Sequence, residues 1–274
     1  MSPVWFITGS SRGLGLSLVH AALQDGANVI ATARKPEQLQ HLVDEYGTDR
    51  ILPLALDVTN NDEVIKAIKL GHDKFGSIDI VVNNAGYANL AATEDITIDD
   101  FRAQLDTNLL GVVYVTKAVL PIMRLQGSGH IFQVSSLGGR LGSPGLCAYQ
   151  ASKWAVGGFS SVVSSEVASL GIKITVLEPG GMKTDWAGPS MQIPPVSTPY
   201  KPTVGAFADM LRAMSGNEVS IPEKVAKIVV DLTKVAEPPL RLLIGTDAVE
   251  YGGNAGRALA ESDQKWHSVS ISSV

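Results

Sequence analysis

Tyr149 and Lys153 are the two residues whose types and spacing point most directly to chemistry. They stand four positions apart, so on a helix their side chains are neighbours, about 5–6 Å apart at Cβ. A lysine charge at that distance favours the tyrosine phenolate by roughly 3 kcal/mol at an effective dielectric near 20. A tyrosine tuned in this way can serve as general acid and base. The same spacing also fits a plain amphipathic helix, so other motifs must decide.

A glycine-rich run follows the first apolar segment and precedes the first helical one. It reads Thr8-Gly9-Ser10-Ser11-Arg12-Gly13-Leu14-Gly15. Glycines there permit a tight turn and let backbone N–H groups approach a pyrophosphate at the helix N-terminus. The G-x-x-x-G-x-G spacing differs from the more familiar G-x-G-x-x-G. Its position directly after a strand candidate favours dinucleotide binding over an ordinary turn.

The second strand candidate ends at Arg34 and Lys35, with no acidic side chain there. In dinucleotide folds an acid at this position holds the ribose 2′-hydroxyl of NAD, whereas an arginine accommodates the 2′-phosphate of NADP. Arg34 and Arg12 both fall at the adenosine end of the expected site, and guanidinium groups suit phosphate. The sequence therefore predicts NADP(H) as cofactor, against the simpler interpretation of two solvated surface arginines.

The rest of the chain must position these groups. Short apolar runs near 4–8, 28–32, 51–56, 78–82, 130–134, 172–177 and 241–244 predict strands. Helical periodicity is found near 14–25, 36–46, 61–75, 98–125, 149–170 and 221–235. Apolar strands alternating with helices imply a parallel sheet covered on both faces. We therefore predict one doubly wound, Rossmann-type α/β domain over residues 1–274, with a mostly parallel seven-stranded sheet.

Two segments depart from this alternation. Residues 185–217 are rich in proline, including Pro189, and in large apolar side chains such as Trp186 and Met191. An apolar insertion of this length predicts a substrate lid. Residues 245–274 form a small, polar tail with a helix expected near 247–261 and a disordered end over 268–274.

Composition excludes several function classes. The 274 residues are 45% hydrophobic and 18% charged, which indicates a well-filled core. A net charge of -5 offers no basic surface for nucleic acid. No apolar run is long enough to span a bilayer, and a single cysteine, Cys147, suits a reducing compartment. We expect a cytoplasmic protein, and because the five histidines lack metal-binding spacing we predict no metal site.

With these motifs in hand, the chain resembles the short-chain dehydrogenase/reductase family over nearly its whole length. Asp57-Val58-Thr59 resembles the family's adenine-side motif, and Asn83-Asn84-Ala85-Gly86 resembles its motif after the fourth strand. Pro179-Gly180 with Thr184 resembles the nicotinamide-side turn. The resemblance implies a cofactor site formed by Gly9, Ser11, Arg12, Gly13, Leu14, Gly15, Arg34, Asp57, Val58, Asn84, Ala85, Gly86, Tyr149, Lys153, Pro179, Gly180 and Thr184.

The resemblance also implies catalytic roles for four residues. Tyr149 would protonate the carbonyl oxygen of the substrate, and Lys153 would lower the pKa of Tyr149 and bind the nicotinamide ribose. Ser136 would polarise the carbonyl, and Asn108 would hold a water that links Lys153 to solvent. Ser135 is adjacent to Ser136, but successive residues at a strand end point in opposite directions. The family interval to Tyr149 favours Ser136.

Substrate walls in this family come from the loops after strands four, five and six. Here those loops and the catalytic pair suggest a lining of Ser136, Leu141, Tyr149, Gly181, Met182 and Trp186, with Tyr87 nearby. Arg140 and Lys183 are the exceptions to a mostly uncharged lining. We therefore expect a hydrophobic ketone, aldehyde or secondary alcohol, as in the 17β-hydroxysteroid dehydrogenase-like and carbonyl-reductase branch.

Two other functions remain to be weighed. Epimerases and dehydratases that keep their nicotinamide bound use a similar Tyr/Lys pair, but they carry a G-x-x-G-x-x-G turn and a larger C-terminal domain. A non-catalytic NADP-binding regulator or scaffold would be marked by loss of Tyr149 or Lys153, and both are present. Relatives often pair through the helices that correspond to 98–125 and 149–170. The resemblance thus implies a homodimer or homotetramer.

Overall fold

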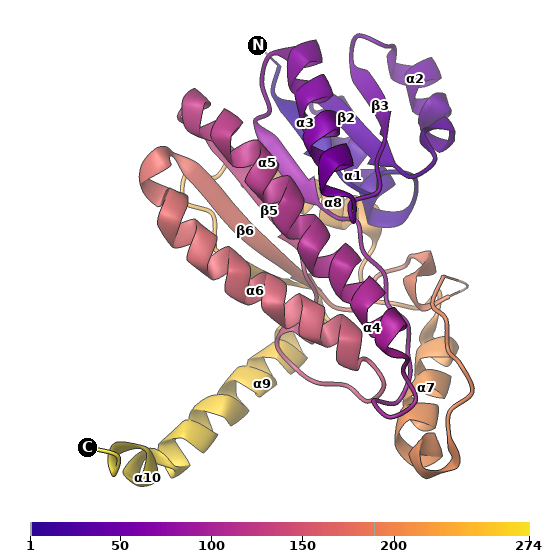
Figure 1. Ribbon diagram of the computed structural model, residues 1–274, viewed down its shortest axis with the longest axis vertical. Helices are drawn as coiled ribbons and strands as arrows, with labels where there is room; N and C mark the ends of the chain where they lie inside the picture. Colours follow the sequence, from indigo (N-terminus) through magenta and orange to yellow (C-terminus); the bar gives the residue numbers. More distant parts are fainter. Residues whose placement is uncertain (1, 189) are drawn as a thin grey trace.

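A seven-stranded parallel sheet forms the centre of the molecule (Figure 1). The computed structural model describes residues 2–188 and 190–274, so Pro189 of the expected lid lies outside the described residues. The sheet order is β3-β2-β1-β4-β5-β6-β7, and every neighbouring pair is parallel. The strands are β1 (Val4–Ile7), β2 (Asn28–Ala33), β3 (Ile51–Ala55), β4 (Ile80–Asn83), β5 (Gly129–Val134), β6 (Ile172–Pro179) and β7 (Arg241–Ile244). The predicted Rossmann-type architecture is confirmed.

Helices cover both faces of this sheet. Those that pack on one face are α1 (Gly13–Gln24), α2 (Gln40–Tyr46) and α8 (Pro222–Thr233), and those on the other are α3 (Asn61–Phe75), α5 (Gly111–Gln126) and α6 (Cys147–Val167). Side chains of a strand alternate between faces. Accordingly Trp5 and Ile7 of β1 pack in the first core, while Val4 and Phe6 pack in the second.

The helix predicted over 98–125 is interrupted in the structure. It begins as α4 (Ile98–Leu105), widens into a π-helical turn over Asp106–Leu110, and continues as α5. Such π-turns inside α-helices are frequent at functional sites. Apolar periodicity could not predict this one, because the extra residue changes the side-chain phase without changing composition. Asn108, a predicted catalytic residue, lies within the turn.

The stretch Ile98–Gln126 is long and apolar enough to cross a membrane by length and composition alone, with a mean hydropathy of 1.4 in its most apolar window. The expectation that no part of the chain has this property was wrong, because it counted only uninterrupted apolar runs. Such a helix is weak evidence for a membrane span, since core helices pass the same test. In this structure Val115, Val119 and Met123, which lie on α5 within that stretch, are buried in the core that packs on this face of the sheet.

The two segments outside the sheet alternation project from the body of the molecule (Figure 1). The segment 185–217 forms three short turns followed by α7 (Ala206–Met214). The tail forms α9 (Thr246–Lys265) and α10 (His267–Ile271). The expected disorder of 268–274 was therefore wrong for its first half, because residues 268–271 belong to α10, a helix that the serine-rich composition did not indicate.

Candidate active site

The carboxyl ends of the parallel strands bring the predicted site residues to one edge of the sheet. The glycine run follows β1, Asn84 follows β4, Ser136 follows β5 and Gly180 follows β6. The strand order reverses between β1 and β4, where doubly wound sheets bind their ligands. Helix α6 then presents Tyr149 and Lys153 to the same edge.

Tyr149 and Lys153 are both buried, and the Lys153 Nζ lies 5.6 Å from the centre of the Tyr149 ring. Burial raises the pKa of Tyr149 to about 12, partly offset by a hydrogen bond with Ser136. Burial also lowers the pKa of Lys153 to about 8. Desolvation is thus the largest cause of both shifts, and the Lys153 Nζ donates a hydrogen bond to the Val134 carbonyl at 2.8 Å. That Lys153 lowers the pKa of Tyr149 stays a prediction.

The two serines after β5 point in different directions, as predicted. The Ser135 hydroxyl donates to the Lys153 carbonyl at 3.1 Å and so fastens the strand end to α6. The Ser136 Oγ accepts from the Gly138 N–H at 3.0 Å and also meets the Tyr149 hydroxyl. The structure therefore places Ser136 beside the phenol and Ser135 beside the helix backbone.

Asn108 is buried under the loop after β4. Its Nδ2 donates to the Tyr87 carbonyl at 2.8 Å and to the Ser152 Oγ at 3.2 Å, and its Oδ1 accepts from the Tyr87 N–H at 3.0 Å. A Cβ on Gly86 would lie 3.0 Å from the Asn108 Oδ1 and 3.5 Å from the Lys153 Nζ, so the two side chains converge at this glycine. The expected water link stays a prediction, while the visible role of Asn108 is to hold the loop against α6.

The glycine turn has the shape of an anion cradle. Gly9 has a φ of 67°, and a Cβ on Gly15 would overlap the Gly9 carbonyl oxygen, so both positions require glycine. Helix α1 begins at Gly13, and its N-cap residue Arg12 makes no side-chain hydrogen bond to the first-turn amides. No acidic side chain occupies that first turn either. The backbone N–H groups and the helix dipole are thus oriented to receive a phosphate, which fits a dinucleotide.

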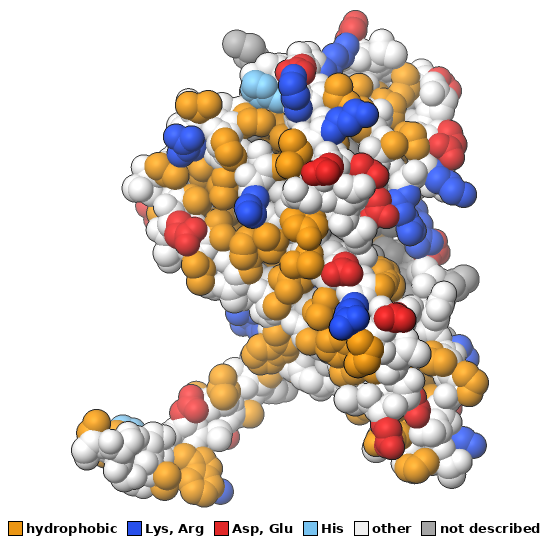
Figure 2. Space-filling model, in the orientation of Figure 1, with side chains coloured by type: hydrophobic (Ala, Val, Ile, Leu, Met, Phe, Trp, Pro, Cys, Tyr) orange, Lys and Arg blue, Asp and Glu red, His pale blue; other side chains and the backbone are white. Residues whose placement is uncertain are grey.

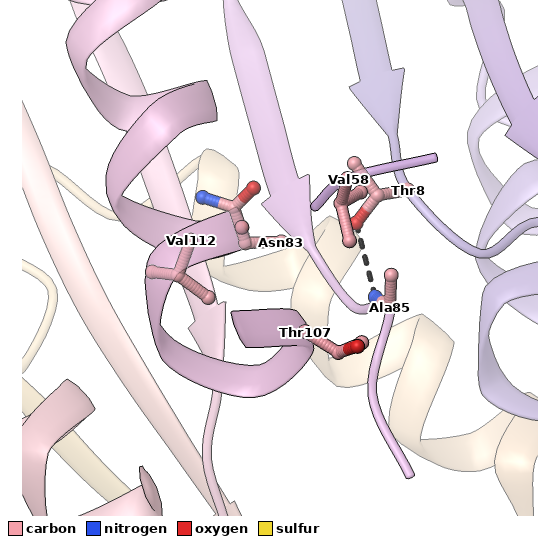
Figure 3. Close-up of a pocket in the computed structure, with 7 residues that line it drawn as sticks. Thr8, Val58, Asn83, Ala85, Thr107 and Val112 are labelled. Atoms are coloured by element: carbon pink, nitrogen blue, oxygen red, sulfur yellow. Dashed lines mark hydrogen bonds between the residues drawn. The ribbon is translucent and has the colours of Figure 1, made fainter. Parts of the chain in front are cut away.

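Asn84 is tied to the glycine turn itself. Its Nδ2 donates to the carbonyls of Thr8 and Gly9 at 2.9 and 3.1 Å. The Thr8 Oγ1 in turn accepts from the N–H group of Asn84 and from that of Ala85, the second of which is drawn in Figure 3. The small cavity of Figure 3, behind this turn, has no room for a water molecule. The Asn84 side chain therefore holds the backbone of the glycine turn in place through hydrogen bonds to its carbonyl groups. The sequence did not indicate this role.

The adenosine end carries the two predicted arginines. Arg34 is exposed directly after β2. Arg12 lies 3.7 Å from Asp185, at the start of the segment 185–217, and both side chains are largely exposed. After β3, Asp57 accepts hydrogen bonds from the Thr59 N–H and hydroxyl, and Val58 is buried. Both arginine side chains are therefore accessible to a phosphate at this end of the site.

An apolar cluster from the segment 185–217 covers Tyr149. The Trp186 ring lies 5.3 Å from the Tyr149 ring. Sequence reasoning missed most of this cluster, because its members come from separate segments; it includes Ala88, Leu90, Ala92, Leu146, Met191, Val204 and Ala208. Met182 is half-buried and packs against the first core, which includes residues of α8, and its place in the substrate lining stays a prediction.

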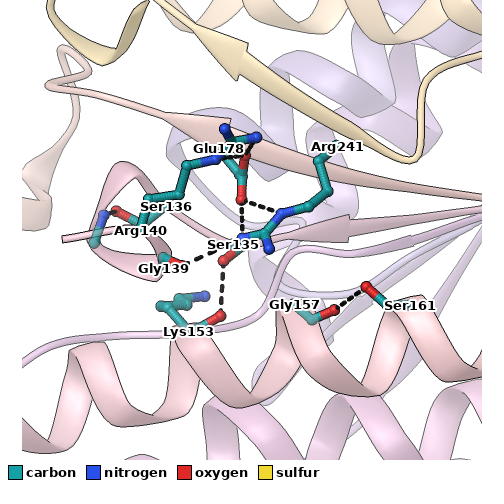
Figure 4. Close-up of polar contacts among 10 residues, drawn as sticks. Ser135, Ser136, Gly139, Arg140, Lys153, Gly157, Ser161, Glu178 and Arg241 are labelled. Carbon is teal, nitrogen blue, oxygen red and sulfur yellow. Dashed lines mark hydrogen bonds and ion pairs between the residues drawn. The ribbon is translucent and has the colours of Figure 1, made fainter. Parts of the chain in front are cut away.

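The turn that follows Ser136 is anchored by the buried carboxylate of Glu178. Glu178 of β6 has no exposed side-chain surface and contacts Arg140 at 2.6 Å and Arg241 at 2.5 Å (Figure 4). Arg241 also donates to the Gly139 carbonyl at 3.2 Å. Arg140, considered as a possible anchor for a charged substrate, is therefore occupied by Glu178.

Comparison with known proteins agrees with this geometry. The family model described as short chain dehydrogenase matches residues 3–192. An oxidoreductase of Botryotinia fuckeliana, BOA17, is 66% identical over the full length of both chains. A short-chain dehydrogenase from Streptomyces avermitilis is 31% identical, with a TM-score of 0.93 over 100% of this chain and 99% of that one. A serine dehydrogenase solved with NADP+ is 28% identical, with a TM-score of 0.76 over 88% and 94% of the two chains.

Proposed function

The chain belongs to the short-chain dehydrogenase family, whose members are oxidoreductases acting on CH–OH and C=O groups, and within it we propose an NADPH-dependent carbonyl reductase. Solved members of the fold bind NADP or NAD. The observation that carries the proposal is the convergence of Tyr149, Ser136 and Lys153 at the strand edge beside the glycine cradle. The same site would run the reverse oxidation of a secondary alcohol.

The chain's own groups would manage the proton and the substrate oxygen. When bound, NADPH supplies a hydride to the carbonyl carbon. The Tyr149 hydroxyl would give its proton to the carbonyl oxygen, while the Ser136 hydroxyl donates a hydrogen bond to the same oxygen as negative charge develops there. The Lys153 ammonium would stabilise the phenolate left behind and bind the nicotinamide ribose. Gly9, Gly13 and the α1 N-terminus would hold the pyrophosphate.

Preference for NADP(H) rests on Arg34. It is exposed at the end of β2, where an acid would have favoured NAD, and a relative sharing 28% of the sequence was solved with NADP+. The apolar cluster over Tyr149 supports a hydrophobic, uncharged substrate. We further propose a cytoplasmic location, from the lone cysteine, and a homodimer or homotetramer paired through α4–α5 and α6. Hydrophobic side chains gather over α5 and α6 (Figure 2), and Trp154 and Val162 of α6 are exposed.

The acid role is tested by Tyr149→Phe. The phenylalanine ring would keep the packing against Trp186 but has no proton to give. We expect the turnover of hydrophobic ketones to fall by about 10²–10⁴-fold, the usual contribution of a positioned acid. Loss of NADPH absorbance measures turnover, and a fluorescence titration shows whether NADPH still binds with wild-type affinity. Turnover near the wild-type rate would refute the assignment, and a wild type that binds NADPH without reducing any ketone would favour a regulator.

The cofactor preference is tested by Arg34→Asp. Removing a charged partner of the 2′-phosphate and adding a like charge should lower the ratio of kcat/KM for NADPH to that for NADH by about 10–100-fold. The matched control is Lys74→Asp, which reverses a charge near the carboxyl end of α3, at the opposite edge of the sheet. Equal ratios for wild type and Arg34→Asp would exclude Arg34 from the 2′-phosphate site.

A further inference from the structure

The C-terminal arm, residues 256–271, stands away from the body of the protein. It comprises the outer part of α9 and all of α10, and it extends as a separate limb in both views (Figures 1 and 2). Every residue from Gly256 to Val274 is exposed. The arm nevertheless carries large apolar side chains, with 61% of Leu259 and 56% of Trp266 accessible to solvent.

The exposed apolar side chains continue the face by which α9 packs on its own body. At the base of the helix, Ala248 and Gly252 are buried, and Gly252 lies against Leu243 of β7. Steps of three and four residues carry this face onward through Ala255, Leu259, Ser262 and Trp266. The opposite face carries Glu250, Arg257 and Gln264. We call this apolar face of the helix the seam. It is buried where α9 meets the body of the protein and exposed along the arm.

The helical conformation of the arm also calls for a packing partner. Three glycines, Gly252, Gly253 and Gly256, lie inside α9, and its N-cap residue provides no side-chain hydrogen bond. Glycine is among the poorest helix formers, and isolated helices of this length are marginal in water. Most of the stability of such a helix comes from packing its apolar face. The body of the chain supplies that packing only at the base of α9, where Gly252 is buried and Gly253 and Ala255 are half-buried.

The surface area of the whole chain is in keeping with a missing partner. A compact monomer of 28.9 kDa is expected to expose about 11,400 Å². This chain exposes 13498 Å². The excess, about 2,100 Å², is larger than the roughly 800 Å² that each partner loses in an interface of standard size.

We propose that the arm packs against a second copy of this chain in a two-fold assembly, with Leu259 and Trp266 as its buried anchors. A two-fold interface uses the same surface on both subunits and must be self-complementary. The arm meets that need, because its bulky tip at Trp266 can pack against the open glycine surface at Gly256, where an added Cβ would meet no neighbouring atom within 4 Å. The inference does not depend on the reaction that the enzyme catalyses.

A membrane surface fits the arm less well. Helices that lie in membrane interfaces are rich in lysine and arginine on their polar face. Residues 246–274 carry four carboxylates and only two basic side chains, Arg257 and Lys265. Within the arm itself Glu261 and Asp263 balance Arg257 and Lys265, so the arm offers no excess positive charge to attract anionic lipid, whereas a second copy of the chain can bury the seam without such charge.

The test compares Leu259→Glu with Gln264→Glu in the full-length protein. Both variants add the same carboxylate to the arm, one on the seam and one on the polar face. Amide hydrogen exchange over 256–266 reports packing of the arm, and light scattering over a dilution series reports assembly. We expect the wild type and Gln264→Glu to be assembled with a protected arm, and Leu259→Glu to exchange about tenfold faster or more there. Dilution of the wild type should also release the arm.

Three results would overturn the proposal. The arm could exchange equally fast in the wild type and in Leu259→Glu, which would mean that nothing packs on the seam. It could be protected in a wild type that is monomeric by light scattering, which would mean that it folds onto its own body. It could also be protected only after addition of phosphatidylserine vesicles, which would identify a membrane partner instead.

Discussion

Tyr149 lies in a site whose low polarity keeps the phenol protonated. Burial raises its pKa to about 12, and the hydrogen bond with Ser136 acts in the opposite direction. A protonated phenol is the form needed to give a proton to a carbonyl oxygen. The same burial disfavours the phenolate that remains, so the Lys153 ammonium and the Ser136 hydroxyl matter most after the proton has left. This arrangement suits reduction at neutral pH.

The pKa of Lys153 predicts the alkaline limit of the reaction. Burial lowers that pKa to about 8, so the side chain is an ammonium at neutral pH and loses its charge above about pH 8. Tyr149 stays protonated throughout this range. Reduction under kcat conditions should therefore be level near neutral pH and decline above about pH 8.

Lys153→Arg provides the control, because a guanidinium keeps its charge at every pH used. Its rate should be low but without the alkaline decline. The measurement is kcat with saturating NADPH and ketone across the pH range. A decline centred near pH 10 in the wild type would show instead that Lys153 keeps an ordinary pKa.

At the scale of elements, Glu178 links three segments to one another: β6, the turn that follows Ser136, and β7. It belongs to β6, just before the Pro179-Gly180 turn, and it binds Arg140 of the Ser136 turn and Arg241 of β7. Arg241 extends the connection to the Gly139 carbonyl. We therefore propose that Glu178 is a positioning residue, one that acts on substrate through the placement of Ser136.

Glu178→Gln should weaken both the fold and the reaction. Removing the charge leaves two arginines uncompensated, and breaking a buried ion pair at one partner costs about 3–5 kcal/mol, with the lower end expected because both arginines are about a third exposed. We expect kcat to fall with little change in the KM for NADPH, because the glycine cradle lies elsewhere. Urea unfolding and steady-state kinetics measure the two effects.

The matched control is Asp231→Asn, which breaks the exposed Lys227–Asp231 pair on α8. Exposed pairs of this kind contribute about 0.5 kcal/mol or less. If Glu178→Gln lost stability but kept its wild-type kcat, the ion pairs would support the fold without positioning Ser136.

The elements were predictable to the extent that each is determined by its own residues. Continuous apolar runs located the seven strands within about two residues, because the five inner strands are mostly buried on both faces and even the half-buried edge strands β3 and β7 keep apolar sequences. Tyr149 and Lys153 could be paired because an i, i+4 relation needs only a helix. The pKa of Tyr149 could not be predicted, since desolvation depends on a cover assembled from distant segments. The Glu178 ion pairs and the packing of Met182 against the first core are likewise products of tertiary packing.

At the scale of the whole molecule, three apolar cores among the described residues divide the chain into parts that we expect to differ in stability. Two of them line the faces of the sheet and enclose all seven strands between them. The third joins Tyr149 and Leu90 to the segment 185–217 through Met191 and Val204. Because Tyr149 is buried within this third core, we expect the segment to move before a substrate reaches the phenol. The segment should therefore open on its own, without unfolding of the sheet.

Val204→Ala and Val82→Ala test this division with the same chemical change. Both valines are buried, Val204 in the third core and Val82 in β4. Losing two methyl groups from the main core should cost about 2 kcal/mol and lower the Tm by roughly 4–8 °C. Val204→Ala should leave the Tm nearly unchanged. The reason is that the third core, which contains Val204, is expected to open at a lower temperature than the one at which the sheet unfolds. It should instead speed amide exchange over 190–214 and raise the KM for a hydrophobic ketone. Equal losses of Tm in the two variants would mean that the segment and the sheet unfold as one unit and that substrate entry needs a different route.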